Sequence, residues 1–202
     1  MLPIYIIDDD THVRQALVML CRSMDLAARP FAGAADFLDD LPFLEPGAVI
    51  VDLRMPDVSG LDLLAAMHER DCLWPTVVIT GHGDIAAAVQ AMKLGAVDFL
   101  QKPFTDEEFE IAVNECARRL PEAIQRSLRS KANRRALDKL TPREREVFDG
   151  VVAGHTSKAI AVRLGLSHRT VETYRLSMMA KLGAQRLHDL LAIGSSGEGM
   201  FK

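Results

Sequence analysis

The chain of 202 residues is 49% hydrophobic, enough for one large core or two small ones, and no apolar run approaches the roughly 18 residues of a membrane span. The net charge of −4 hides a division: residues 1–120 hold 9 Lys and Arg against 20 Asp and Glu, a net of −11, whereas residues 121–202 hold 15 against 8, a net of +7. This division predicts two domains, and the basic second half is the candidate for binding a polyanion.

The cysteine pattern and the start of the chain bear on where the protein works. Cys21, Cys72 and Cys116 are an odd, widely spaced set, which argues against a disulfide framework or a zinc site. No signal-peptide pattern opens the sequence. We therefore expect a protein of the reducing cytoplasm that does not enter a membrane.

The first half alternates short apolar strands with amphipathic helices. Strands are predicted at 3–7, 26–31, 48–52, 76–80 and 97–101. Helices are predicted at 11–24, 34–40, 60–70 and 84–94, with a fifth beginning near Thr105. This alternation is typical of an α/β fold with a five-stranded, doubly wound parallel sheet.

One strand carries the first candidate for chemistry. The run 48–51 is apolar and continuous, as in a strand buried on both faces, and it leads directly into Asp52. Taken alone, Asp52 is more simply explained as an ordinary cap at a strand end. Three adjacent carboxylates at Asp8, Asp9 and Asp10 follow the first strand, and they repel one another unless a cation compensates them or the turn is solvated.

Further polar residues lie at the ends of other strands. Because the carboxyl ends of parallel strands meet at one edge, we expect Asp8, Asp9, Asp52, Thr80 and Lys102 to converge there. Carboxylate oxygens of this kind suit Mg²⁺. The sequence lacks the glycine-rich loops that bind nucleotides, and a carboxylate nucleophile beside a cation and a lysine fits an aspartyl-phosphate.

Residues 1–120 resemble a response-regulator receiver domain, which has a flavodoxin-like fold. The matching motifs are Ile7-Asp8-Asp9-Asp10, Val51-Asp52-Leu53-Arg54-Met55-Pro56, Thr80-Gly81-His82-Gly83-Asp84 and Lys102-Pro103-Phe104. The resemblance implies that Asp52 is the phosphoacceptor. It also implies that Asp8 and Asp9 form the acidic pair, with Asp9, Asp52 and the Arg54 carbonyl contacting Mg²⁺.

The same resemblance assigns residues that respond to the phosphate. Thr80 and Lys102 match the hydroxyl and the cation that bind it, and Phe99 occupies the aromatic switch position, although it is equally well explained as core. Lys102-Pro103 matches the family's cis peptide. His82 is either a loop residue or one that tunes the lifetime of the phosphate.

The connection between the halves is charged and helix-prone. We expect the helix that begins near Thr105 to end or kink near 119–120, with Pro121 as the first residue of a second helix. Ile124 and Leu128, four residues apart, make that helix either a pairing surface for a second subunit or a solvated linker.

The second half predicts a small all-α domain. Thr141, Pro142 and Glu144 form a helix start with a capping box. That helix is followed by helices predicted at 157–164, 168–182 and 187–193. The tight turn 165–167 between two of them indicates a helix-turn-helix, whose core we expect to contain Val162, Leu164, Leu166 and Val171.

Residues 140–193 resemble the LuxR/NarL-type DNA-binding domain, and the whole chain resembles the FixJ-type subgroup. The matching residues are Leu140-Thr141-Pro142-Arg143-Glu144, Gly154, Lys158, Ile160-Ala161, Leu166-Ser167 and Thr170-Val171-Glu172. The resemblance assigns base reading to Glu172, Thr173 and Leu176. Phosphate contacts are expected from cations on the same face. The expected DNA-binding residues are Lys158, Arg169, Thr170, Glu172, Thr173, Arg175, Leu176 and Lys181.

We interpret the chain as a cytoplasmic two-component regulator that takes phosphate on Asp52 from a sensor histidine kinase and dimerises to bind promoter DNA. Although the receiver would catalyse its own phosphotransfer, the chain is not expected to be an enzyme in the usual sense. The domains are expected at 1–120 for the receiver, 121–138 for a helical linker, 139–194 for the DNA-binding domain and 195–202 for a disordered tail.

Two alternatives remain at this point. The first is a phosphate sink or protein-interaction adaptor whose helical domain binds protein, and a lack of salt-dependent DNA binding would favour it. The second is a haloacid-dehalogenase-like phosphohydrolase. Such enzymes have Asp-x-Asp-x-Thr/Val after the first strand, and Asp8-Asp9-Asp10-Thr11 resembles this pattern except that position 12 is His.

Overall fold

The computed structural model describes residues 2–81 and 85–195, which form two compact units, Met1–Ser127 and Leu128–Lys202. We call the first the receiver unit and the second the helical unit. The expected roles of His82 and Asp84 and the expected tail at 196–202 lie outside the described residues. No helix in the described ranges is long and apolar enough to cross a membrane.

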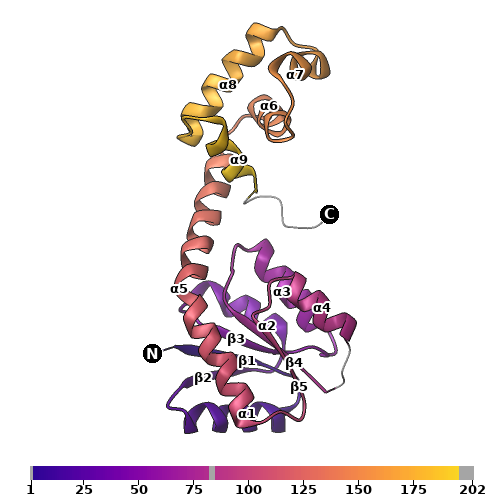
Figure 1. The fold of residues 1–202 in the computed structure, drawn as a ribbon, viewed down its shortest axis with the longest axis vertical. Helices are drawn as coiled ribbons and strands as arrows, with labels where there is room; N and C mark the ends of the chain where they lie inside the picture. Colours follow the sequence, from indigo (N-terminus) through magenta and orange to yellow (C-terminus); the bar gives the residue numbers. More distant parts are fainter. Residues whose placement is uncertain (1, 82–84, 196–202) are drawn as a thin grey trace. The chain divides into compact units, whose positions relative to one another are not determined.

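A five-stranded parallel sheet forms the centre of the receiver unit (Figure 1). Its strands are β1 (Pro3–Ile7), β2 (Ala27–Phe31), β3 (Ala48–Asp52), β4 (Thr76–Thr80) and β5 (Asp98–Gln101). The order β2-β1-β3-β4-β5 reverses direction between β1 and β3, which is where doubly wound sheets bind ligands. Ile7 lies opposite Val51, so that the ends of β1 and β3 are level.

Helices alternate with these strands. They are α1 (Thr11–Ser23), α2 (Ala34–Asp40) with the short 3₁₀ turn η1 (Leu41–Phe43), α3 (Gly60–Glu69), α4 (Ile85–Lys93) and α5 (Asp106–Leu137). Local capping fixes where two of them begin. The Asp10 carboxylate accepts from the backbone of His12 and Val13 at the start of α1, and Ser59 forms a capping box with Asp62 at the start of α3.

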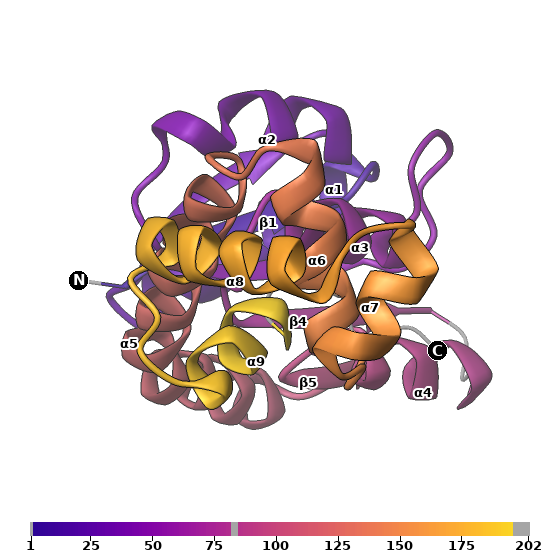
Figure 2. The same ribbon diagram turned by 90° about the horizontal axis from the view of Figure 1, so that it is seen from above.

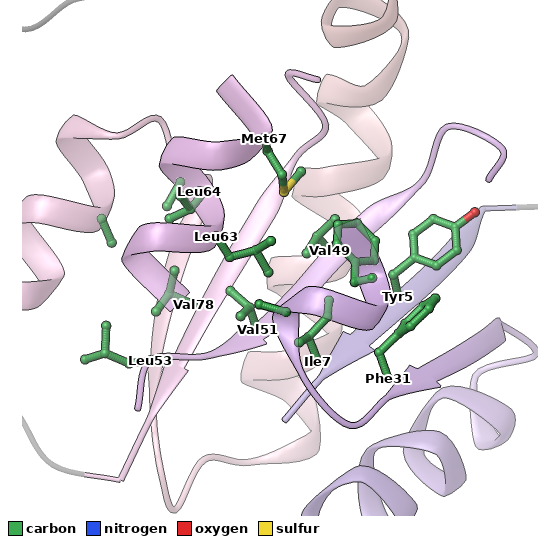
Figure 3. Packing of buried hydrophobic residues seen from close by; sticks show 14 of the residues in the cluster. Tyr5, Ile7, Phe31, Val49, Val51, Leu53, Leu63, Leu64, Met67 and Val78 are labelled. Atoms are coloured by element: carbon green, nitrogen blue, oxygen red, sulfur yellow. The ribbon is translucent and has the colours of Figure 1, made fainter. Parts of the chain in front are cut away.

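Each face of the sheet has its own core. On one face, strand residues such as Val49 and Val51 pack with Phe37 of α2 and Leu63 of α3, as Figure 3 shows in part. On the other face, helices α1 and α5 cover β1, β3 and β4, with Phe109 at the centre. Because β1, β3 and β4 are covered on both faces, they consist of continuous apolar runs rather than alternating ones.

Two cysteines belong to the second of these cores. Cys21 on α1 and Cys116 on α5 are fully buried, and their thiols are free. Burial raises the pKa of Cys21 to about 11 and that of Cys116 to about 12. Both side chains therefore act as small apolar residues of the core.

The helix that begins near Thr105 does not end before Pro121, which was one of the two expected outcomes, because α5 continues through this proline as one helix of 32 residues. Residues beyond the proline pack on the receiver unit: Ala123 is 1% exposed, and the buried Ser127 hydroxyl accepts from the Leu73 backbone N–H at 2.9 Å. These contacts offset the helical hydrogen bond that Pro121 cannot donate. The boundary between the two units falls inside α5, after Ser127.

The helical unit packs its helices around a separate core. Its helices are α6 (Pro142–Val152), α7 (Ser157–Leu164), α8 (His168–Leu182) and α9 (Leu187–Ser195), and Figure 2 shows α8 along its length. Val147, Val171 and Met178 are fully buried. Val162, expected in this core, is 80% exposed, because α7 turns its Ile160 and Ala161 side inward.

Candidate functional site

The expected acidic and basic residues meet at the carboxyl edge of the receiver sheet. Asp8 follows β1, Asp52 ends β3 and Lys102 follows β5. The Lys102 ammonium bridges the two carboxylates, with Nζ 2.9 Å from Asp8 Oδ2 and 2.6 Å from Asp52 Oδ1. Asp8 is 2% exposed and Asp52 9%. The sheet thus brings together three charged groups that are up to 94 residues apart in sequence.

Burial of the site and the shared ammonium of Lys102 shift the pKa values of Asp8 and Lys102 for different reasons. Burial raises the pKa of Asp8 above its usual value, although hydrogen bonds from Lys102 and from the Asp10 backbone oppose this effect. Burial alone would lower the pKa of Lys102, but hydrogen bonds to Asp52 and Asp8 outweigh it and hold that pKa above its usual value. Lys102 therefore stays a cation in the site.

The main chain around Asp52 fixes the direction of its carboxylate. Asp52 Oδ2 accepts from the Arg54 backbone N–H at 2.7 Å, and Leu53 N–H donates to the Ile79 carbonyl of the neighbouring strand. Gly60 at the start of α3 lies against β3, where a Cβ atom would come within 2.6 Å of the Asp52 carbonyl oxygen. The peptide bond Lys102-Pro103 is cis, as expected.

The donor set of this edge suits a hard cation. In the described ranges no three His, Cys, Asp or Glu side chains converge closely enough to bind a metal as they stand. Mg²⁺ usually binds one or two carboxylates and completes its shell with water, and Asp8 and Asp52 supply such oxygens. Asp9 is exposed and lines a hollow of about 240 Å³ together with the loop that follows β3. The residues present therefore fit Mg²⁺.

Arg14 was not among the residues expected at this site. Its Nη1 donates to the carbonyls of Asp8, at 2.7 Å, and of Asp9, at 2.9 Å, while Nη2 donates to Thr11 Oγ1 at 3.0 Å. The repulsion among three adjacent carboxylates was the signal that a compensating cation was needed. Arg14, one turn into α1, places a cation beside this turn, although it bonds to the carbonyls rather than to the carboxylates.

The expected switch residues lie beside the charged cluster. Thr80 ends β4, is 1% exposed and accepts from Lys102 N–H through its carbonyl at 2.7 Å. Phe99 on β5 is half-buried and packs against the core beneath α3 and α4. Large apolar side chains are exposed on two helices of the receiver unit, namely Val89 and Met92 on α4 and Ile111 on α5.

The helical unit contains the expected helix-turn-helix. Gly165 ends α7 with a left-handed φ of 65°, and the Ser167 hydroxyl accepts from Thr170 N–H to begin α8. Of the residues expected to contact DNA, Lys158, Arg169, Thr173 and Leu176 are exposed, whereas Thr170, Glu172 and Arg175 are half-buried. The Thr173 hydroxyl donates back to the Arg169 carbonyl at 3.0 Å.

Two of the expected phosphate-binding cations make bonds within the helical unit. Arg175 Nη1 donates to the buried Ser157 hydroxyl at 2.6 Å and so joins α8 to α7. Lys181 Nζ lies 2.6 Å from Glu144, which is 3% exposed and also accepts from Ser177 Oγ and the Thr141 backbone. The Glu144 network joins α8 to α6. The capping box at Thr141 predicted the local half of this network, but not its partners on α8.

Two family models match the chain. The first describes the response regulator receiver domain and matches residues 4–114. The second describes bacterial regulatory proteins of the luxR family and matches residues 138–193. The first model covers the sheet edge with Asp8, Asp52 and Lys102, and the second covers the helix-turn-helix.

Curated relatives align with nearly the whole chain. The transcriptional regulatory protein FixJ of Azorhizobium caulinodans is 43% identical over 191 residues, covering 94% of this chain and 90% of that protein. FixJ of Rhizobium meliloti is 39% identical over 194 residues, covering 96% and 95%. Among solved structures, full-length FixJ from B. japonicum matches with a TM-score of 0.58 and 38% identity, covering 99% of this chain and 98% of that one.

Proposed function

The chain belongs to the response regulators that join a receiver domain to a LuxR-type DNA-binding domain, and from this membership we propose that Asp52 is the residue that is phosphorylated. The protein is a phosphorylation-activated, DNA-binding transcriptional regulator. The observation that carries the assignment is the Lys102 ammonium held between Asp8 and Asp52 at the carboxyl edge of the sheet.

In the proposed reaction, an Asp52 oxygen attacks the phosphorus of a phosphohistidine on a sensor histidine kinase. The new P–O bond forms as the P–N bond breaks, and the histidine leaves with its nitrogen lone pair. Lys102 stays protonated and neutralises charge on the transferred phosphoryl group. Asp8, Asp9, Asp52 and the Arg54 carbonyl would hold Mg²⁺, which would supply further positive charge beside the transferred group.

The activated state is proposed to be a homodimer. Thr80 and Lys102 bind the phosphoryl group, and Phe99 follows the movement of Thr80. Val89, Met92 and Ile111 then take part in a pairing surface formed by α4, β5 and α5, because these apolar side chains are exposed in the unphosphorylated unit. Two tethered DNA-binding domains raise affinity by effective concentration.

The proposed DNA interface separates two kinds of contact. Glu172, Thr173 and Leu176, with Thr170 at the start of α8, are assigned to the bases in the major groove. Lys158 and Arg169, both exposed, are assigned to phosphates. Arg175 and Lys181 are assigned mainly to holding α8 in place, because both bond within the unit. The protein is proposed to act in the cytoplasm, where a kinase and promoter DNA are both accessible.

Mass spectrometry after incubation with a small phosphodonor and Mg²⁺ tests the phosphoacceptor. Wild-type chain gains about 80 Da, the mass of one phosphoryl group. Asp52→Asn loses this adduct, whereas the control Asp57→Asn, an exposed carboxylate in the next loop, keeps it. An adduct that persists in Asp52→Asn contradicts the assignment.

Sedimentation with and without beryllofluoride tests pairing. We expect a monomer that becomes a dimer, and we expect Met92→Lys to stay monomeric while still being phosphorylated. A lack of salt-dependent DNA binding would instead favour the adaptor alternative, in which the helical domain binds protein.

A further inference from the structure

Arg14 stands where a helix ordinarily disfavours a cation. It lies one turn into α1, close to the N-terminal end that the Asp10 carboxylate caps, and that end of a helix carries partial positive charge. The local sequence therefore departs from the usual charge preference at the position that faces the Asp8–Asp10 turn. Such departures commonly occur at functional sites.

The guanidinium bonds to the main chain of the acidic turn rather than to its carboxylates. One nitrogen, Nη1, bridges the carbonyls of Asp8 and Asp9, and Nη2 reaches the Thr11 hydroxyl. The carboxylates therefore keep their oxygens for other ligands. Only a planar fork makes several such bonds in fixed directions, so a lysine cannot replace it geometrically.

The two acidic residues depend on Arg14 to different degrees. Asp8 is also fixed through its side chain, by Lys102 at Oδ2 and by the Asp10 N–H at Oδ1. Asp9 is exposed and is anchored through its carbonyl, which accepts from Arg14. The direction of the Asp9 carboxylate is thus set by a main chain that Arg14 holds.

We propose that Arg14 is a positioning residue for the acidic turn, and that its bridge between the Asp8 and Asp9 carbonyls presents Asp9 to the Mg²⁺ used in phosphotransfer. This inference rests on the proposed metal role of Asp9. A group that orients metal ligands typically changes metal affinity by about 10- to 100-fold when it is removed.

A role through charge and a role through geometry predict opposite changes in Mg²⁺ affinity for the same substitution of Arg14. If Arg14 acted only through its charge, Arg14→Gln would make the site more negative and tighten Mg²⁺ binding. If Arg14 positions the turn, Arg14→Gln weakens binding. Arg14→Lys keeps the charge and removes the fork, so it also weakens binding under the positioning proposal.

Isothermal titration calorimetry of the unphosphorylated full chain with MgCl₂ decides between the charge role and the positioning role of Arg14. Circular dichroism verifies that each variant folds. We expect Arg14→Gln and Arg14→Lys each to weaken binding by roughly 10-fold or more. Arg22→Gln, which removes an exposed cation from the last turn of the same helix, is expected to stay within about twofold, because its charge is screened.

Binding by Arg14→Gln that equals or exceeds wild-type binding overturns the inference, as does full retention by Arg14→Lys. If Arg14→Gln does not fold, Arg14→Lys decides alone. Asp9→Asn separates this failure from that of the proposed function. If Asp9→Asn binds Mg²⁺ as tightly as wild type, the metal role of Asp9 is wrong. If Asp9→Asn weakens binding and the Arg14 variants do not, only the positioning role is wrong.

Discussion

Each unit contains a buried ion pair with a lysine, and the two ion pairs differ in how many hydrogen-bond donors each carboxylate has. Lys102 lies 2.6 Å from Asp52 in the receiver unit, and Lys181 lies 2.6 Å from Glu144 in the helical unit. Glu144 also receives hydrogen bonds from Ser177 and from the Thr141 backbone. In the receiver unit, by contrast, one ammonium is shared between two buried carboxylates.

The pKa values follow this difference. Hydrogen bonds from Lys181, Ser177 and Thr141 lower the pKa of Glu144 to about 2. Burial instead raises the pKa of Asp8. Folding therefore favours the charged form of Glu144 and disfavours that of Asp8. The charge of Glu144 contributes to stability, whereas the charge of Asp8 is one that the fold disfavours, as charges kept for function often are.

Glu144→Ala is expected to give the largest change. It removes the acceptor of the Thr141 N–H, Ser177 and Lys181, and we expect the helical unit to unfold at a temperature lower by roughly 5 °C or more. Hydrogen exchange in α6 and α8 of the full chain, with thermal unfolding, measures the effect. Glu146→Ala, which breaks only an exposed pair with Arg143, is the matched control. An equal fall in unfolding temperature for the two substitutions would show that the buried Glu144 network stabilises the unit no more than an exposed ion pair does.

Asp8→Asn is expected to act in the opposite direction. Asparagine keeps the shape of the side chain and removes the charge that burial disfavours, so the metal-free receiver unit should unfold a few degrees higher. Fluorescence of Trp74, the single tryptophan, reports this unit specifically. Asp57→Asn, which neutralises an exposed acid, should leave the midpoint unchanged. A lower midpoint for Asp8→Asn would refute the contrast between the two units.

Low pH should destabilise the helical unit through protonation of Glu144. Because its pKa falls from 4.5 in the unfolded chain to about 2 in the fold, the charged form stabilises the helical unit at pH values above about 4.5. This contribution is lost as the pH falls from about 4.5 to about 2. An acid titration followed by circular dichroism should show a shallower loss for Glu144→Gln than for wild type. The same slope in both chains would count against the lowered pKa.

The smallest expected change in stability distinguishes two lysines of the helical unit. Lys158 is exposed, so Lys158→Gln should leave stability unchanged. It should reduce the salt slope, which is the slope of log K for DNA binding against log salt concentration, by about one. Lys181→Gln should lower stability and leave the salt slope nearly unchanged, because Lys181 is paired with Glu144. Binding measured at several salt concentrations gives both slopes, and a reversed pattern would return Lys181 to the phosphate contacts.

Much of the receiver fold could be predicted from the sequence because its signals are local. The apolar runs of β3 and β4 stop at Asp52 and Thr80, and a parallel sheet brings such ends to one edge. The meeting of Asp52 with Lys102, 50 residues later, followed from that topology alone.

The misjudged features depended on tertiary contacts. The local cost of Pro121 predicts an end or a kink of the helix, whereas Ala123 and Ser127 pack on the receiver unit and α5 continues past the proline. Val162 was placed in the core from its apolar side chain, although its position on α7 leaves it exposed. The bonds of Arg14 and of Lys181 to their partners could not be read from spacing, because long cations reach several turns or helices.

The burial of the cysteines has a practical consequence for measuring how the chain responds to phosphate. With a pKa of about 11 for Cys21 and about 12 for Cys116, fewer than roughly one thiol in a thousand is ionised at pH 7, and thiol reagents attack the thiolate. Cys72 is likewise buried. A cysteine introduced at an exposed position without an assigned role, such as Gln125 on α5, should therefore take a fluorescent or spin label selectively in the otherwise native chain.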